Sequence, residues 1–166
     1  FLERVESDVG WRLKVIPGRE EARLIYLGVR QAIDLSGKPA LIVDVGGGSV
    51  ELVLIKKSEA VLLDSVKLGV ARLSERFLAS DPPTGSELEE LEEHLDRELA
   101  PFFGRIEGER VKRVIGTSGT LLNLISIAGY LGGDPPNGHL NNYVVSAAEI
   151  GKVRRLLSRM TRQERL

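Results

Sequence analysis

The sequence has no cysteine, two histidines, one tryptophan and one methionine. The lack of cysteine excludes disulfides and thiolate metal sites, and it permits a cytoplasmic location. Neither sign of charge is in excess, because 23 lysines and arginines stand against 24 aspartates and glutamates. No overall field therefore favours binding to nucleic acid or to an anionic membrane. A polyanionic ligand would have to be bound by a local group of residues.

Long hydrophobic segments and several common catalytic motifs are also missing. Residues 114–133 carry no charge, but the glycines, serines and threonines among them favour a buried strand, loop and helix over a membrane span. The P-loop, dinucleotide-binding, zinc-protease and nucleophile-elbow motifs do not occur, which disfavours those chemistries. The size of 166 residues suits one domain, and the start at Phe1 without an initiator methionine predicts a piece of a longer protein.

The central feature of the sequence is a run of three glycines between two β-branched segments, residues 41–45 and 50–55. This pattern predicts a β-hairpin rather than a strand that leads into a helix. With residues 46–49 as the loop, Asp44 faces Glu51 across the hairpin. Opposed side chains lie about 5 Å apart at Cβ, and two carboxylates there repel each other unless a cation or a shared proton lies between them. The pair is a candidate cation site.

The hairpin loop itself is a candidate phosphate site. Gly46, Gly47, Gly48 and Ser49 offer backbone N–H groups and a hydroxyl with no bulky side chain in the way. A phosphate with a hard cation beside it would suit both halves of the hairpin. An ordinary glycine-rich hairpin with solvent-exposed acids would show the same spacing, so the loop alone does not decide between these readings.

A second glycine-containing segment follows a predicted strand at 110–115 and opens an apolar helix at 121–131. It consists of Gly116, Thr117, Ser118, Gly119 and Thr120. Free N–H groups and the dipole at a helix start suit an anion, although a capped strand-to-helix turn is the alternative. Two such segments in one small domain support phosphate binding better than either does alone.

The helix predicted at 19–34 carries an unusual acid. Glu21 shares a stripe with Leu24, Ile25, Gly28 and Ala32, whereas Glu20 points elsewhere. A carboxylate on an apolar stripe would have a raised pKa and could act as a base near neutral pH. The turn at residues 36–39 closes this helix and is a candidate domain boundary.

The other expected elements are short. They are a strand at 13–16, a strand at 60–66, helices at 70–77 and from Ser86 to Pro101, and a helix after Ser146. Trp11 is predicted to pack against other residues, His94 to lie at the surface and His139 to lie in a loop. The basic face of the last helix is a conceivable contact for a chain of phosphates.

Four blocks of the sequence together resemble the exopolyphosphatase and guanosine-pentaphosphate phosphohydrolase family. They are residues 15–29, 44–52, 68–77 and 116–120, in the family's order. The family belongs to the actin, sugar-kinase and heat-shock-protein superfamily, whose two ribonuclease-H-like domains flank a cleft. The resemblance implies an α/β fold with a mixed sheet and flanking helices. Residues 1–37 would be the tail of the first domain and 38–166 a C-terminally truncated second domain.

The resemblance also implies functions for individual residues. Glu21 would be the catalytic carboxylate, and Asp44 and Glu51 would lie at a magnesium site. Residues 46–49 would form a phosphate loop, with 116–120 near the distal end of the phosphate chain. Val50 and Pro17 replace the family's usual threonine and serine. The glycine-serine loop and substrate-binding arginine of the family's first domain do not precede Phe1.

The function expected from these features is Mg²⁺-dependent release of terminal orthophosphate from polyphosphate or guanosine pentaphosphate. Glu21 would orient or deprotonate the attacking water. An ATP-dependent kinase or ATPase of the same superfamily is one alternative. A module that senses polyphosphate or an alarmone without turnover is another. Because members of the superfamily often form homodimers, a homodimer is a reasonable expectation.

Overall fold

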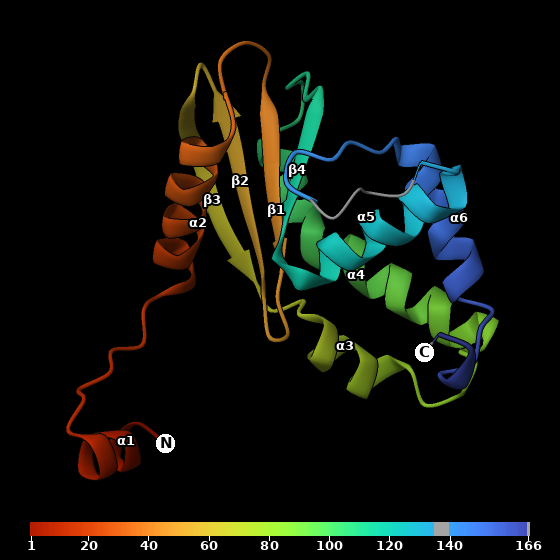
Figure 1. The fold of residues 1–166 in the computed structure, drawn as a ribbon, viewed down its shortest axis with the longest axis horizontal. Helices are drawn as coiled ribbons and strands as arrows, with labels where there is room; N and C mark the ends of the chain where they lie inside the picture. Colours follow the sequence, from red (N-terminus) through yellow and green to blue (C-terminus); the bar gives the residue numbers. More distant parts are fainter. Residues whose placement is uncertain (135–139, 166) are drawn as a thin grey trace.

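A computed structural model describes residues 1–134 and 140–165, so His139 lies outside the described residues. The elements are α1 (Leu2–Val9), α2 (Gly18–Ala32), β1 (Ala40–Val45), β2 (Val50–Lys56), β3 (Glu59–Val66), α3 (Val70–Phe77), α4 (Gly85–Arg105), β4 (Arg113–Thr117), α5 (Ser118–Gly132), α6 (Ala147–Leu157) and a 3₁₀ turn at Gln163–Arg165 (Figure 1). The strands form one mixed sheet in the order β3-β2-β1-β4, with β1 and β4 parallel. The predicted mixed sheet with flanking helices is confirmed.

The predicted hairpin is also present. β1 and β2 pair antiparallel with Val45 opposite Val50 and Asp44 opposite Glu51. Apart from Asp44, Glu51 and Lys56, the residues of both strands are β-branched or aliphatic, and only residues 46–49 separate the strands. The register follows from this short connection, because a slip by one residue would turn each apolar side chain to the wrong face.

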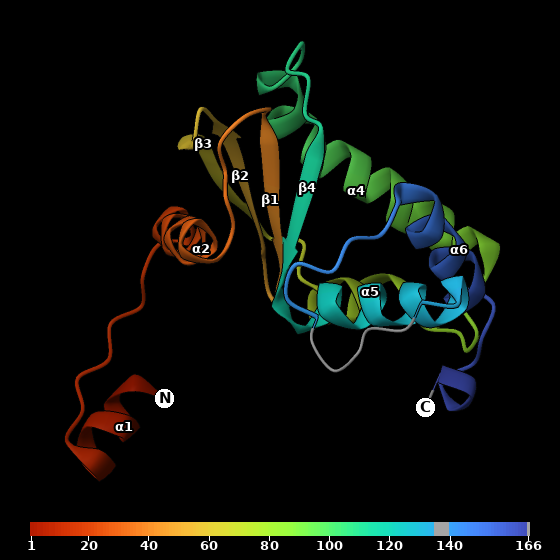
Figure 2. The ribbon, with the colours of Figure 1, turned by 45° about the horizontal axis from the view of Figure 1, so that its top comes forward.

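Helices cover both faces of this sheet (Figure 2). On one face α2 contributes Ala22, Tyr26 and Val29 to a buried cluster with Ile42 and Val53. On the other face the end of α4 packs against the strands. The side chains at this contact form a second buried cluster, which includes Leu41, Leu52, Leu54, Phe102 and Ile106. The helix predicted as the tail of a first domain therefore shares a core with the sheet, and the domain division at residues 37 and 38 stays a prediction.

Two predictions about α4 are wrong. Pro101 lies inside the helix, which continues to Arg105. The helix continues because Phe102, 1% exposed, and Ile106, 8% exposed, are buried against the sheet beyond the proline. His94 is buried at 8% exposure rather than at the surface, and its ring lies tilted against that of Phe77 of α3 with 4.9 Å between centroids. His94 therefore helps to join α3 to α4.

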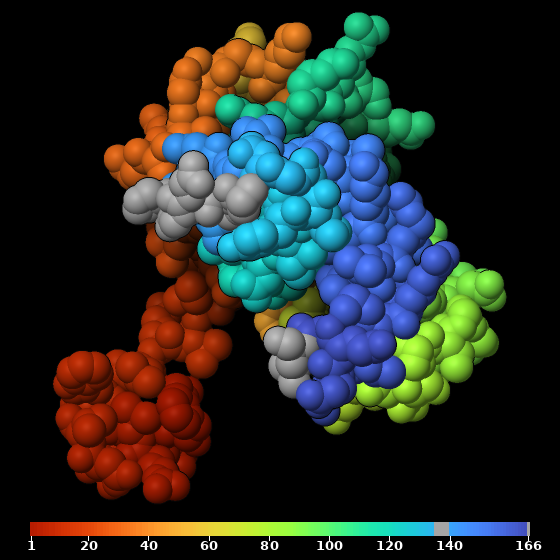
Figure 3. Space-filling model, turned by 45° about the vertical axis from the view of Figure 1, so that its right-hand side comes forward, coloured from red at the N-terminus to blue at the C-terminus, as the bar shows by residue number. Residues whose placement is uncertain are grey.

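The first 17 residues depart most from the prediction. α1 and the segment after it stand apart from the rest of the chain (Figures 1 and 3). Residues 13–16 form no strand, and Trp11 is 71% exposed, so neither the strand nor the packed tryptophan is confirmed. A β-strand needs a partner for its backbone groups, and the described sheet offers none to this segment.

The C-terminal half lies beside β4. α5 follows β4 without a loop, and α6 packs against α5. An ion pair between Arg154 of α6 and Glu92 joins α6 to α4. None of the helices in residues 1–134 and 140–165 is long and apolar enough to cross a bilayer.

Candidate active site

Four polar side chains form a row across the sheet at the end nearest the β1–β2 loop. β3, β2, β1 and β4 contribute Ser65, Glu51, Asp44 and Thr117, and each is the register partner of the next. Side chains along a strand alternate between faces, so these four lie on the same face as Ile42, the face that α2 covers. The apolar core of that face thus ends in two carboxylates flanked by two hydroxyls.

Hydroxyl groups hold the two carboxylates of this row. Ser65 donates a hydrogen bond of 2.8 Å to Glu51, and Thr117 donates one to Asp44. Glu51 is 2% exposed and Asp44 is half-buried. Ionised carboxylates are costly to bury without a positive partner. No lysine or arginine among the described residues forms an ion pair with either acid. The row therefore favours a bound cation.

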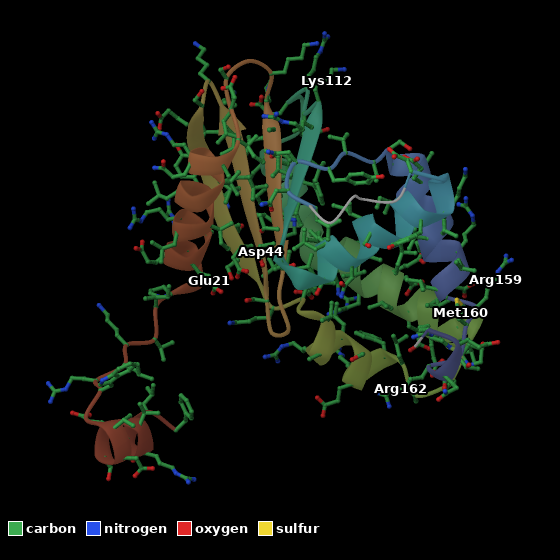
Figure 4. The ribbon with its side chains drawn as sticks, viewed as in Figure 1. Glu21, Asp44, Lys112, Arg159, Met160 and Arg162 are labelled. Atoms are coloured by element: carbon green, nitrogen blue, oxygen red, sulfur yellow. The ribbon has the colours of Figure 1, made fainter. Side chains whose placement is uncertain are left out.

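Glu21 lies in the first turn of α2, next to this row. The start of α2 lies directly against β3, because a Cβ on Gly18 would be 2.3 Å from the Ser65 hydroxyl oxygen. Figure 4 shows Glu21 and Asp44 at the same end of the sheet. Partial burial raises the pKa of Glu21, and the negative charges of Glu51 and Asp44 raise it further. The three acids are thus close enough to influence one another.

The cause of this raised pKa agrees in part with the prediction. The side chains of α2 that pack on the sheet are Ala22, Tyr26 and Val29. The stripe of Glu21 lies at the margin of this contact, since Ile25 packs against the core cluster whereas Leu24 is 47% exposed. The direction of the pKa shift and its largest cause, burial, agree with the prediction, and the charges of Glu51 and Asp44 are a further cause that the stripe did not predict.

The donor chemistry of the site suits a hard cation. Asp44 and Glu51 offer carboxylate oxygens, which Mg²⁺ prefers. Within the described part of the chain, no three histidine, aspartate or glutamate side chains are grouped so as to hold a metal ion. Magnesium sites often use one or two carboxylates and complete their coordination with water and substrate phosphate. Asp44 and Glu51 fit a site of that kind.

The loop at residues 46–49 leaves several amides open. The Gly46 N–H donates to the Ser49 carbonyl at 3.0 Å, which closes the turn. The next two residues, Gly47 and Gly48, are exposed. In the part of the chain that the structure describes, no acceptor takes the N–H of Gly47, Gly48 or Ser49. These groups are available for an anion, as a backbone nest requires.

The second predicted phosphate loop is a strand-to-helix junction. Gly116 and Thr117 end β4, and Ser118 begins α5 with a φ of 79°. This left-handed conformation costs a non-glycine residue roughly 1–2 kcal/mol. The Ser118 hydroxyl donates to the Val45 carbonyl at 3.0 Å, which joins the junction to the hairpin. The hydroxyls of Thr117 and Ser118 are therefore already bound within the protein.

The first turn of α5 still has groups to offer. No side chain caps it, so the amides of Gly119 and Thr120 lack an intrahelical acceptor, as at any helix start. Gly119 is exposed and Thr120 is half-buried. Because Ser118 is bonded to Val45, this helix start lies beside the triglycine loop. The two segments predicted to bind phosphate are therefore brought together.

Two residues near the acids were not predicted. Ser65 binds Glu51, and the charge of Lys67 lowers the pKa of Glu21 against the stronger effects that raise it. Lys67 also lines a surface pocket with Gly18 and Arg19. A regular hairpin register, counted from the β2–β3 turn, would pair Glu51 with Asp64. A bulge between Leu54 and Ile55 shifts the partner of Glu51 to Ser65. The sequence contains no clear signal for this bulge.

Comparisons with known proteins give a consistent result. A model of the Ppx/GppA phosphatase family matches residues 1–166. Exopolyphosphatase 2 of Mycobacterium tuberculosis is 34% identical over 157 residues, which cover 94% of this chain and 48% of that protein.

Solved structures agree with this match. The crystal structure of an exopolyphosphatase from Cytophaga hutchinsonii is similar with a TM-score of 0.87 and 30% identity, and the match covers 99% of this chain and 53% of that one. The Aquifex aeolicus member of the Ppx/GppA family gives a TM-score of 0.78 at 30% identity, covering 99% of this chain and 51% of that one. The chain thus spans about half the length of the relatives that it matches.

Proposed function

Because the chain belongs to the Ppx/GppA phosphatase family, we propose that it carries part of the active site of a hydrolase that releases terminal orthophosphate from inorganic polyphosphate. The observation that supports this most is the meeting of Glu21, the carboxylates of Asp44 and Glu51, and the open amides of the triglycine loop at one end of the sheet. Relatives named exopolyphosphatase favour polyphosphate over guanosine pentaphosphate, which remains the second candidate substrate.

Glu21 is proposed to orient or deprotonate the attacking water. Hydrolysis of a phosphoanhydride needs a positioned water and neutralised charge more than it needs covalent chemistry. A carboxylate with a raised pKa is a stronger base than an ordinary glutamate, and the exposed side chain of Glu21 is accessible to substrate. Lys67, whose charge acts on Glu21, is well placed to attract the substrate's phosphates.

Asp44 and Glu51 are proposed to hold Mg²⁺, directly or through its waters. The ion would supply positive charge against the phosphoryl oxygens. The role of this chain is to hold the two carboxylates in place. Thr117 and Ser65 do so by donating hydrogen bonds to them. The two acids can then receive a cation without a change in their own positions.

The backbone amides are proposed to bind the phosphate oxygens. Gly47, Gly48 and Ser49 present N–H groups beside the acids, and the first turn of α5 presents those of Gly119 and Thr120. Groups of this kind bind anions with no change in protonation. The two sets are adjacent, which suits consecutive phosphates of a chain better than a single ion.

Phosphate release by the full-length protein tests this function. Long-chain polyphosphate, guanosine pentaphosphate and ATP would each be assayed with and without Mg²⁺. Release from polyphosphate that requires Mg²⁺ is the expected result. Turnover of ATP alone would instead identify a kinase or ATPase of the superfamily, and binding of polyphosphate without release would identify a sensing module. The homodimer also stays a prediction, which light scattering of the same protein would test.

A further inference from the structure

The triglycine loop is bound by the N-terminal turn of α3. The Val70 N–H donates to the Gly46 carbonyl at 3.0 Å. The Ala71 N–H donates to the Gly47 carbonyl at 3.1 Å, and that of Arg72 approaches the same oxygen at 3.4 Å. The free amides at the start of α3 are therefore used within the protein, and their acceptors are loop carbonyls.

This bonding determines where the loop amides point. A trans peptide is planar, and its C=O and N–H groups point in opposite directions. The Gly46 carbonyl shares a peptide unit with the Gly47 N–H, and the Gly47 carbonyl shares one with the Gly48 N–H. Holding both carbonyls toward α3 thus turns the N–H groups of Gly47 and Gly48 away from it. These are two of the amides that have no acceptor in the described residues.

Gly69 makes this close approach possible. A Cβ at residue 69 would lie 2.2 Å from the Gly48 nitrogen and 2.3 Å from the carbonyl carbon and oxygen of Gly47. These are backbone atoms, so no side-chain rotation could relieve the clash. The conformation of Gly69, φ −67° and ψ 149°, is open to any residue. Glycine is therefore required at residue 69 because there is no space for a Cβ, and not because of the backbone conformation.

The support beneath the loop is itself fixed. Leu68 is 3% exposed and belongs to the core on the α4 face of the sheet. At the other end of α3, the ring of Phe77 contacts that of the buried His94 of α4. The helix is thus anchored on both sides of the residues that contact the loop. A packed element of this kind transmits a displacement instead of absorbing it.

We propose that Gly69 and the first turn of α3 form a positioning element, which directs the amides of Gly47 and Gly48 toward phosphoryl oxygens. The proposal rests on the proposed function, since it names what orients the phosphate site. The positive end of the α3 dipole also faces the loop carbonyls. Polarisation through the two peptide units makes their N–H groups stronger donors to an anion.

The first test is Gly69→Ala in the full-length protein, with Gly85→Ala as the matched control. Residue 85 begins α4 and has no atom within 4 Å of an added Cβ. Gly69→Ala is expected to lower phosphate release from polyphosphate by about 100-fold, the effect of losing one preorganised donor. Gly85→Ala is expected to retain the wild-type rate. A Gly69→Ala protein with wild-type turnover would overturn the proposal.

A second pair of variants removes one amide without adding a Cβ at residue 69. Val70→Pro deletes the N–H that binds the Gly46 carbonyl, at the first helical position, where proline is tolerated. The extended conformation of Gly69 is also the one that a following proline requires. Val70→Ala keeps the amide and provides the baseline. Val70→Pro is expected to be about tenfold slower than Val70→Ala, and equal rates would contradict the proposal.

Amide NMR separates this inference from the proposed activity. Tripolyphosphate with Mg²⁺ would be titrated into wild-type protein, Gly69→Ala and Val70→Pro while the Gly47 and Gly48 resonances are followed. The resonances should shift in the wild type and shift far less in both variants. That result supports positioning even if no phosphate is released. An equal response in all three proteins, or no response in the wild type, would overturn it whatever the activity.

Discussion

At the scale of single residues, burial and neighbouring charge together explain the raised pKa of the candidate base. The raised pKa of Glu21 comes first from partial burial and then from Glu51 and Asp44. Sequence periodicity predicted the direction of this shift correctly, and the role of Glu21 as a base stays a prediction. Periodicity could not predict the contribution of the two neighbouring charges, because these acids lie more than 20 positions away in the chain and approach Glu21 only in the folded protein.

Glu21→Gln in the full-length protein tests the base directly. Glutamine has the same size but cannot accept a proton at neutral pH, so phosphate release should fall by 100-fold or more, typical of a lost general base. Polyphosphate binding, measured by titration calorimetry, should be nearly unchanged. Glu20→Gln is the control, because Glu20 is paired with Arg23 on the same turn. Undiminished release by Glu21→Gln would remove Glu21 from the mechanism.

Asp44→Asn should change both metal and pH dependence. Asparagine can still accept the Thr117 hydrogen bond, so the loss is mainly one of charge. Half-maximal activity should need more Mg²⁺. The loss of a neighbouring negative charge should also lower the pKa of Glu21. A base is active when deprotonated, so the acid limb of the pH–rate profile should move to lower pH. An unchanged Mg²⁺ titration would count against the cation site.

At the scale of elements, the parts of the fold that depend on local patterns could be predicted. The hairpin, the strand before α3 and the extents of α2 and α3 follow from alternation, helical periodicity and turn residues. The β2–β3 bulge, the continuation of α4 past Pro101 and the absence of a strand at 13–16 could not. Each depends on whether a distant partner is available, which local pattern does not record.

The start of α4 shows how one acid organises an element. Glu87 accepts backbone hydrogen bonds from Ala79, Ser80 and Thr84, and these bonds lower its pKa to about 2. Thr84 is the N-cap residue and forms a capping box with Glu87, so the helix begins at Gly85, one residue before the predicted start at Ser86.

Glu87→Gln tests this contribution through the pH dependence of stability. The folded-state pKa lies below the ordinary value of 4.5, so the stabilisation is fully present above pH 4.5 and is lost as pH falls toward 2. The variant should therefore have a lower free energy of unfolding than the wild type at pH 7, with a difference that shrinks below pH 4.5. Glu93→Gln, on the exposed face of α4, is the control. A pH-independent difference would show that the charge of Glu87 is not the cause.

At the scale of the whole molecule, the candidate site is a product of topology. Strand order β3-β2-β1-β4 places Ser65, Glu51, Asp44 and Thr117 side by side, and α2 adds Glu21 from outside the sheet. The hairpin register predicted the central pair correctly. The two flanking hydroxyls could not be predicted, since their place depends on the bulge in β3 pairing and on a parallel crossover to β4.

The central claim is that these acids and the triglycine loop bind one metal–phosphoanhydride complex. Its most direct test is a crystal structure of the full-length Glu21→Gln protein soaked with Mn²⁺ and tripolyphosphate, using anomalous scattering to locate the metal. We expect a manganese ion bound by Asp44 and Glu51. We also expect a phosphate bound to the amides of Gly47 and Gly48, with residue 21 facing its phosphorus. Manganese and phosphate bound away from these residues, with the loop amides unoccupied, would contradict it.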